Sequence, residues 1–389
     1  MNVKTNNYGP IVSNDATERL ARNDIKPVTA YKTDIIYNGL AYFTRHNPFY
    51  TVLFYFFVSY VMTYVIGILS GQLNGGGGRN PMHTYILDNL CMGILAPIGA
   101  GLITNLYKKI SDATGIIGAK RIIKDGDLRA YQALLNKFDA KFNNYYITAA
   151  STILAFLISA FIYFHRKTSW LGIAGGITGI YDSIFVFLNF AMIITIVYKS
   201  CITIWLIQKI ISFDINIRPM HPDHAGGLRH IGSLSMAVNY FLILVMFYFS
   251  LLLIFDAFAQ RFILIYLFFY VFTFFIFFAS LYEAHKKMRR VKDEALEKLE
   301  NTSNHYYYKL VTSAGALGIY DLDSADEIIM VDNLYTIVEK MPVWPFNINN
   351  IIKFFSVFIT PLIIFIISLL VNTDSILYNW KLIFNLLTK

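Results

Sequence analysis

The residues best suited to chemistry gather in one short segment, Arg218-Pro-Met-His-Pro-Asp-His-Ala-Gly-Gly-Leu-Arg-His230. Imidazole and carboxylate groups together bind zinc or iron, and His221, Asp223 and His224 are close enough for at least two of them to face one ion. A convincing zinc site needs three or four ligands, and no cysteine or second acidic cluster is spaced to supply the others. The segment therefore gives a metal-site hypothesis built on these three residues.

Two interpretations of the same segment need no metal. Gly226 and Gly227 could present backbone N–H groups to an anion, with Arg229 and His230 completing a candidate ligand- or ion-binding set. In the structural alternative, the two prolines fix φ, Asp223 caps, and the glycine pair permits the reversal into the next helix. We favour the structural turn over ligand binding, and both over catalysis.

Three further polar residues interrupt apolar stretches, where ionisable groups are costly and usually functional. Asp88 and Asn89 lie in the second such stretch and Lys199 lies in the fourth. Placed along helices that cross a core of about 30 Å, Asp88 and Lys199 differ in depth by some 12 Å, which is too far for a direct salt bridge. We expect Asp88 to begin a helix rather than line a water-filled vestibule, and Lys199 to lie near the inner boundary.

The elements that position these residues must be membrane helices. Apolar residues make up 56% of the chain and charged ones 15%, with a mean hydropathy of +0.49, whereas a soluble domain carries about 25% charged residues. The formal charge of +8 falls in the gaps between apolar stretches, which indicates topology and no nucleic-acid partner. Cys91 and Cys201 fit neither a disulfide framework nor a metal site, and we predict no cofactor.

The sequence predicts an all-α fold, a polytopic membrane helical bundle with about seven transmembrane helices in residues 50–371. A crossing needs roughly 20 apolar residues. The stretches that meet this need are 50–70, 84–106, 146–164, 180–207, 236–257, 262–282 and 351–371.

The positions of lysine and arginine predict the orientation. They concentrate in alternate gaps between the apolar stretches, so the positive-inside rule places the N-terminus in the cytoplasm. We expect the protein to lie in the cell (inner) membrane. The cytoplasmic parts are then the N-terminal segment 1–49 and the insertions 107–145, 208–235 and 283–349, while the short tail 372–389 is external.

Two insertions continue membrane helices into the cytoplasm. Apolar residues recur at spacings of three and four from Leu128 to Tyr145, without a breaker before the third crossing, and again from Leu281 to Ala295. We expect these helical extensions to pack together or self-associate as a short bundle; separate helices on the membrane surface are the alternative.

Two further features concern single segments. The long apolar run 180–213 either forms one helix that tilts and protrudes, or crosses the membrane by about Lys199 and then follows the inner interface. The acidic segment 321–332 lacks the glycine and final glutamate of an EF-hand loop. We expect it to be a solvated surface, with the basic run 286–292 as a candidate partner.

A second short motif, Met341-Pro-Val-Trp-Pro-Phe-Asn347, precedes the last crossing. Trp344 beside two prolines is typical of an interface anchor that turns the chain into the bilayer. Together, His221-Pro-Asp-x-x-Gly-Gly-Leu228 and this Pro-Val-Trp-Pro-Phe run resemble a group of uncharacterised bacterial multi-pass membrane proteins. The resemblance implies a membrane topology and no activity.

No nucleophile elbow, Walker loop, dinucleotide fingerprint or HExxH motif occurs. We therefore predict a channel-like or sensor membrane protein that forms a homo-oligomer in the lipid bilayer, with a layout similar to the seven-helix ion channels of insect chemosensation. One alternative is a membrane-interface enzyme that uses His221, Asp223 and His224 with a metal. The other is a membrane docking partner that binds a soluble cytoplasmic protein through 107–145 and 283–349.

Overall fold

The structure is a computed structural model, and its described residues are helical apart from short connections. Their one β feature is an isolated antiparallel bridge between Ile123 and Ile215. The described residues are 27–28, 34–69, 90–119, 122–165, 176–219, 221, 223, 225–255, 263–317, 322–346 and 348–371.

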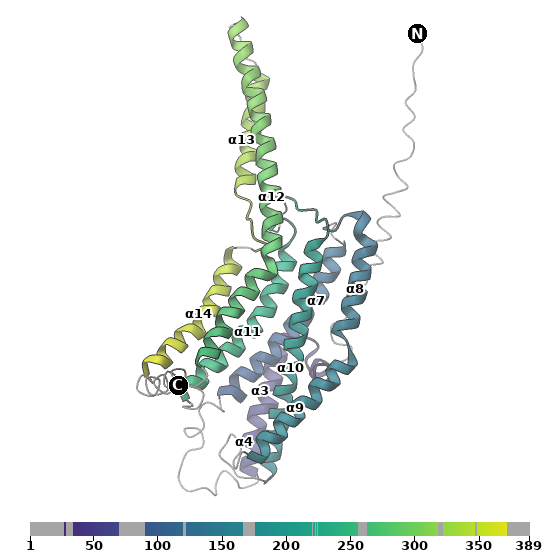
Figure 1. The fold of residues 1–389 in the computed structure, drawn as a ribbon, viewed down its shortest axis with the longest axis vertical. Helices are drawn as coiled ribbons and strands as arrows, with labels where there is room; N and C mark the ends of the chain where they lie inside the picture. Colours follow the sequence, from purple (N-terminus) through teal and green to yellow (C-terminus); the bar gives the residue numbers. More distant parts are fainter. Residues whose placement is uncertain are drawn as a thin grey trace, which may run out of the picture.

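Most of the helices run side by side as a bundle, from which two project at one end (Figure 1). Two π-helical turns, Phe57–Val61 and Cys91–Leu95, lie before α4 and α7, and a 3-10 turn, Asp125–Asp127, lies before α8. The α-helices are α2 (Ile35–Thr44), α3 (Pro48–Phe56), α4 (Met62–Leu69), α7 (Ala96–Ala119), α8 (Leu128–Phe142), α9 (Tyr145–His165), α10 (Gly176–Ser212), α11 (Arg229–Phe255), α12 (Ile263–Leu317), α13 (Leu322–Glu339) and α14 (Ile348–Val371).

Five helical spans in the described residues are long and apolar enough to cross a bilayer. This finding confirms the predicted class, a multi-pass helical membrane protein. Seven crossings stay a prediction, because the stretch 84–106 begins outside the described residues and Ile351–Ile367 is a shorter apolar helix. The five spans are Pro48–Leu69, Asp125–Phe161, Ser183–Ser212, Arg229–Leu251 and Tyr266–Thr312.

Helix α7, which corresponds to the second apolar stretch, is largely buried inside the bundle. It packs against α3 and α11, and most of its residues between Pro97 and Gly118 are buried. A Cβ on Gly101 would lie 2.5 Å from Cγ2 of Val52, so glycine permits the close approach to α3. Other helices therefore cover much of α7.

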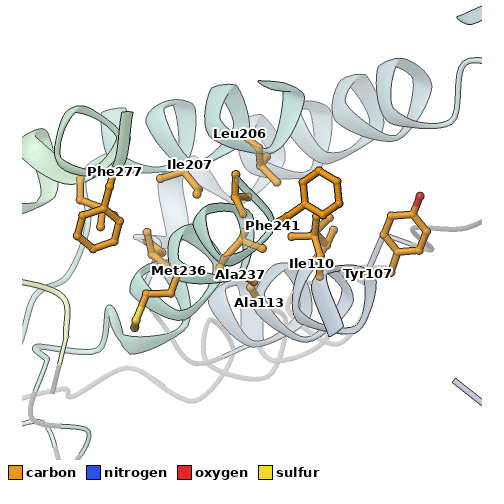
Figure 2. Close-up of a cluster of buried hydrophobic side chains, with 14 of the residues drawn as sticks. Tyr107, Ile110, Ala113, Leu206, Ile207, Met236, Ala237, Phe241 and Phe277 are labelled. Carbon is orange, nitrogen blue, oxygen red and sulfur yellow. The ribbon is translucent and has the colours of Figure 1, made fainter. Parts of the chain in front are cut away.

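The hydrophobic core continues where α7, α10 and α11 meet (Figure 2). Ile110 of α7, Leu206 of α10 and Phe241 of α11 are all buried there. Helix α10 is one continuous helix of 37 residues, about 55 Å long at 1.5 Å per residue. Its course agrees with the first alternative for this segment, a single protruding helix, and its last turns are covered by other helices instead of lying on a membrane surface.

The chain breaks between α8 and α9, which the sequence analysis did not expect. Asn143 leaves the helical region with φ −102° and ψ 36°, and Oδ1 of Asn144 accepts a hydrogen bond of 3.0 Å from the N–H of Tyr146. Asparagine side chains favour such caps over helix interiors. The prediction of an uninterrupted helix from 128 into the third crossing was therefore wrong.

The apolar stripe of α8 is buried, but its partners are membrane helices. Leu135 and Phe138 face inward, α8 contacts α10 and α7, and Tyr131 donates a hydrogen bond of 2.8 Å to the carbonyl of Thr114. The expected pairing of this stripe with the extension of the sixth crossing is wrong, because α13 is the helix that packs along α12. Self-association stays a prediction.

Helix α12 leaves the bundle as one helix of 55 residues, about 80 Å long, and α13 returns antiparallel to it (Figure 1). This hairpin confirms that the sixth crossing continues as a helical extension. Lys292 donates to the carbonyl of Met341, so the basic run 286–292 lies beside the chain after α13. The described part of the acidic segment 321–332 lies toward the far end, and the suggested pairing of these two segments is wrong.

Candidate functional site

Lys199 is fully buried in the middle of α10. A lysine side chain in such a place needs a compensating charge, since an unpaired buried ammonium is costly. Its Nζ lies 3.7 Å from Oδ2 of Asp34, whose side chain is 11% exposed. The partner comes from the N-terminal part of the chain, immediately before α2.

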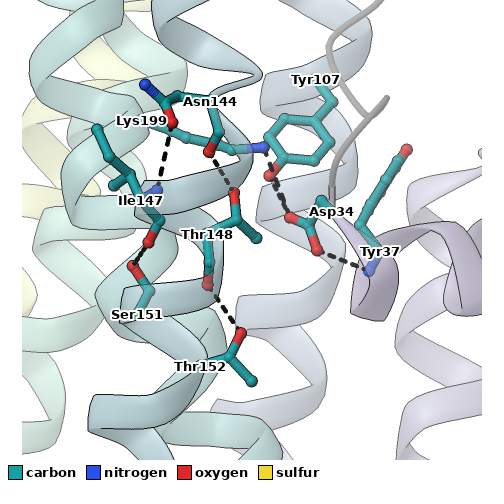
Figure 3. A network of polar contacts seen from close by, with 9 residues as sticks. All are labelled: Asp34, Tyr37, Tyr107, Asn144, Ile147, Thr148, Ser151, Thr152 and Lys199. Atoms are coloured by element: carbon teal, nitrogen blue, oxygen red, sulfur yellow. Dashed lines mark hydrogen bonds and ion pairs between the residues drawn. The ribbon is translucent and has the colours of Figure 1, made fainter.

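Asp34 is held in place by two hydrogen bonds (Figure 3). As the N-cap of α2, it accepts a bond of 3.0 Å at Oδ1 from the backbone N–H of Tyr37. At Oδ2 it accepts a bond of 2.6 Å from the hydroxyl of Tyr107 in α7. The carboxylate is thereby fixed between the start of α2 and the bundle, with Oδ2 turned toward Lys199.

Aromatic rings complete the surroundings of the ammonium. Nζ of Lys199 lies 4.7 Å from the ring centroid of Tyr107 and 4.7 Å from that of Phe142, and a desolvated cation–π contact contributes about 2 kcal/mol. Tyr37 packs edge-on against Tyr107 with centroids 4.5 Å apart. Within the described residues, Nζ nevertheless forms no hydrogen bond. The ion pair is buried but loosely made.

A small cavity adjoins this cluster. It lies between α2, α7 and α10, is lined by Asp34, Tyr37, Tyr107, Thr195 and apolar side chains, and has a volume of about 10 Å³. A single water molecule needs about this much room and two or more polar partners. The cavity therefore has room for one water molecule beside the Asp34 carboxylate.

The sequence analysis identified Lys199 and missed Asp34. Phe142, which packs on the lysine, lies just before α9 begins at Tyr145; the position of Lys199 near the inner boundary stays a prediction. Asp34 was assigned to a cytoplasmic segment, yet α2 buries Tyr37 and Ala41 against the bundle. An aspartate ahead of apolar residues at helical spacing was the available signal for a capped helix.

A second polar cluster joins α3, α10 and the turn before α7. The hydroxyl of Tyr55 donates a bond of 2.7 Å to Oδ1 of Asn189, whose Nδ2 lies 3.3 Å from Sδ of Met92. Ser59, in one π-helical turn, donates to the carbonyl of Met92 in the other at 3.3 Å. None of these residues was a sequence candidate; the candidates Asp88 and Asn89 lie outside the described residues.

The geometry of the 218–230 segment supports the structural turn. Oδ1 of Asp223 accepts backbone N–H bonds from Ala225 at 2.9 Å and Gly227 at 3.0 Å, and lies 2.8 Å from Nδ1 of His221. Partial burial raises the pKa of Asp223, but the two backbone N–H groups and His221 outweigh it and hold that pKa below its usual value. The carboxylate of Asp223 therefore stabilises the conformation of the loop through hydrogen bonds to its backbone.

The other candidate residues of this segment fit the same turn. Gly226 and Gly227 have φ of +62° and +93°, a region that glycine enters without strain. The N–H of Arg229, the first residue of α11, lies 3.4 Å from Oδ2 of Asp223, and His230 follows within α11. His224 lies outside the described residues, among which no group of three metal-ligating side chains occurs.

The two short motifs of the sequence are neighbours in space. A Cβ on Gly226 would lie 3.3 Å from Cε of Met341, and one on Gly232 would lie 2.0 Å from the carbonyl oxygen of Pro345. The start of α11 therefore packs directly on the Pro-Val-Trp-Pro-Phe run, with only backbone between them at Gly232. Trp344 is half-buried and stacks on His285 with centroids 4.3 Å apart; its role as an interface anchor stays a prediction.

Comparisons with protein-family models, with curated proteins and with solved structures found no match. The class is defined by the structure itself, a multi-pass helical membrane protein with five long apolar spans.

Proposed function

We propose that this chain is a membrane sensor or channel-like protein, in which the ion pair of Asp34 and Lys199 latches helix α2 to the membrane bundle. The observation that carries the proposal is a fully buried lysine in α10 whose charge is balanced from a separate N-terminal element. Such intramembrane charges are functional by default. In this proposal, the latch has a closed state and a released state.

The energetics of buried ion pairs favour a switch over a purely stabilising contact. Apolar side chains of similar volume stabilise an interior as well as a buried pair does, so stability alone gives no reason for Lys199. The separation of 3.7 Å, the absence of a hydrogen bond at Nζ within the described residues and the adjoining cavity leave the pair incomplete. An incomplete pair lowers the cost of release.

The packing of α10 gives a route from the latch to the projecting hairpin. Helix α10, which carries Lys199, contacts α12, and α12 runs without a break from the bundle to Leu317. A packed helix of this kind transmits a displacement as a rigid element. Release of α2 from α10 would therefore be transmitted through α12 to the hairpin.

The channel-like form of the proposal draws on the two π-helical turns. They face each other, because Ser59 bonds to the carbonyl of Met92 and Gly93 lies against the ring of Tyr60. Such turns occur frequently at functional sites. A conduction path would involve this region and a homo-oligomer, and ion flux into liposomes with the stoichiometry of the purified protein tests both.

A soluble cytoplasmic partner is a second proposal, carried by the surface of the hairpin. Large apolar side chains on both helices are exposed, among them Tyr307 and Tyr308 of α12 and Ile329 and Met330 of α13. Exposed apolar patches of this kind mark interaction sites. Loss of a co-purifying protein from a variant with serine at these positions would support docking; a chain that captures nothing would count against it.

The interface-enzyme alternative has less support, because the carboxylate of Asp223 already accepts hydrogen bonds from the backbone N–H groups of Ala225 and Gly227. It remains a hypothesis on His221, Asp223 and His224. Metal analysis of the purified protein tests it, and stoichiometric zinc or iron that is lost in His221→Ala would revive it.

The latch is tested by a distance measurement between α2 and α10. Tyr42 of α2 is 83% exposed, and Cys201 is exposed on α10, two residues after Lys199. With Cys91 replaced by serine, spin labels at Tyr42→Cys and at Cys201 report the separation of the two helices. Pulsed electron–electron double resonance in nanodiscs should give one narrow distribution of distances between the two labels. Asp34→Asn should add a second, broader distribution.

Lys209→Met is the matched control, since it removes an exposed lysine from the same helix and should leave the distribution narrow. If Asp34→Asn and Lys199→Met both leave the distance unchanged, α2 is not held by the pair, and the latch proposal fails.

A further inference from the structure

One face of α12 changes character in a regular order along the helix. Its exposed positions recur every three or four residues, as a single helical face requires. In chain order, the face is apolar and aromatic, then carries Tyr282, then becomes basic, and finally becomes acidic at Asp293. Its exposed members before the acidic end are Phe268, Phe272, Phe275, Tyr282, Lys286 and Arg289.

This order matches the layers of a membrane boundary. Exposed phenylalanines belong in hydrocarbon, and tyrosine is enriched at the interface. At 1.5 Å per residue, Lys286 lies about 6 Å and Arg289 about 10 Å beyond Tyr282. The headgroup layer is about 5–7 Å thick on each side of the hydrocarbon core. Lys286 therefore falls within this layer, and Arg289 lies at its aqueous edge.

A shallow groove between exposed side chains of α12 lies at the same height, and each described residue that lines it belongs to this helix. Tyr282, His285, Lys286, Arg289 and Arg290 line the half nearer the apolar residues, and acidic side chains line the other half. The groove thus presents cations toward the membrane and carboxylates away from it. An anion at its membrane end is attracted, and a long polyanion in solution is repelled by the far end.

The cations of this groove are available to a ligand. Arg289 and Arg290 form pairs with Asp293 at 3.7 Å and Glu294 at 2.7 Å, but exposed pairs between residues four apart contribute little and can exchange for a phosphate. Lys286 is exposed and has no ion pair with a described residue.

The neighbouring lysines have a different task. Lys287 donates a bond of 2.7 Å to the carbonyl of Phe213, and Lys292 donates one of 3.2 Å to the carbonyl of Met341. These bonds hold α12 against adjacent segments. The five cations between residues 286 and 292 therefore divide into two that fix the helix and three that face the groove.

We propose that this groove binds the phosphate of an anionic phospholipid headgroup through Lys286 and Arg289. The occupant is a lipid, because the same helical face continues without interruption into exposed phenylalanines, which would lie alongside acyl chains in a bilayer. A cluster of basic residues directly after a membrane helix is the arrangement that recognises such headgroups.

Trp344 provides an intrinsic reporter, since it stacks on His285, which lines the groove. The protein is reconstituted into phosphatidylcholine vesicles that contain a fixed fraction of dibrominated lipid, either phosphatidylglycerol or phosphatidylcholine, and quenching of tryptophan fluorescence is measured. The same measurement on Trp344→Phe gives the contribution of the other tryptophans. Brominated phosphatidylglycerol should quench Trp344 more strongly than brominated phosphatidylcholine.

The double variant Lys286→Gln, Arg289→Gln should lose this preference by roughly 30-fold in relative affinity, as two headgroup-level cations predict. The control double variant Lys298→Gln, Lys309→Gln removes the same charge farther along α12. It should keep the preference within about twofold, because both lysines lie farther from the headgroup layer than the Debye length of about 8 Å. Equal quenching by the two lipids in the unaltered protein, or equal loss in both variants, would overturn the proposal. So would removal of the preference by millimolar inorganic phosphate, which would identify a site for free phosphate.

Discussion

The buried pair should reveal itself as strong energetic coupling between Asp34 and Lys199. Asp34→Asn removes the charge and keeps an oxygen that can accept the N–H of Tyr37, now at 3.0 Å. Lys199→Met keeps the length of the side chain and removes the ammonium. Comparing each single variant with the double variant isolates the interaction of the two groups.

The structure sets the expected magnitudes. Asp34→Asn leaves a buried ammonium, 1% exposed, without its counter-charge, and breaking a buried pair in this way costs about 3–5 kcal/mol. Lys199→Met should cost less, about 1–3 kcal/mol, because Asp34 keeps the hydroxyl of Tyr107 at 2.6 Å. The double variant should return to within about 1 kcal/mol of the unaltered protein, since it removes both charges and leaves no uncompensated ion in the interior.

The free energy of unfolding is measured in mixed micelles by titration with a denaturing detergent and is followed by tryptophan fluorescence. Trp205 lies on α10, the helix that carries Lys199. Lys209→Met is the control, and an exposed lysine of the same helix should change stability by less than about 0.5 kcal/mol. A coupling free energy of at least about 2 kcal/mol is expected.

Additive effects of Asp34→Asn and Lys199→Met would refute the reasoning, because additivity means that the two groups do not interact. A cost below about 0.5 kcal/mol for Asp34→Asn would do the same, since it would mean that Lys199 reaches water without help.

Two other predictions concern the packing of the short motifs. Gly232→Ala should lower the free energy of unfolding by about 1–3 kcal/mol or more, because its Cβ would lie 2.0 Å from the carbonyl oxygen of Pro345. The control Gly39→Ala in α2 places a Cβ with nothing within 4 Å and should be neutral or stabilising. Equal effects of the two variants in detergent unfolding would contradict the contact. The pKa of Asp223 is lower in the folded protein than its value near 3.8 in the unfolded chain. The ionised carboxylate therefore stabilises the fold at pH values above 3.8, and this stabilisation is lost as the pH falls through the folded-state pKa. Asp223→Asn should therefore cost about 1–3 kcal/mol at neutral pH and progressively less below pH about 4, and a cost that does not depend on pH would show that the carboxylate charge is irrelevant.

Local patterns in the sequence predict much of this fold. Apolar length identifies the membrane helices, and the spacing from Leu281 to Ala295 predicts that the sixth crossing continues as a helix, as α12 does. Lys199 stands out because a charge within an apolar run is costly. These features depend on residues close together in the chain, so a sequence contains them directly.

Contacts between distant segments could not be predicted in the same way. Asp34 and Lys199 are separated by most of the N-terminal half of the chain, and nothing local to either residue names the other. The packing of Gly232 on Pro345 depends on the α12–α13 hairpin, which returns the chain to the start of α11. The break at Asn143 could have been predicted, because asparagine side chains such as those of Asn143 and Asn144 favour helix ends. The helical spacing of apolar residues, which continues across the break, instead favoured one uninterrupted helix.

The most direct test of the central claim is an experimental structure of the full chain in lipid nanodiscs, resolved well enough to place side chains. It should show α2 against α7 and α10, with Nζ of Lys199 within about 4 Å of the Asp34 carboxylate, the limit for an ion pair. A structure in which α2 lies away from the bundle while Lys199 extends to water would contradict it.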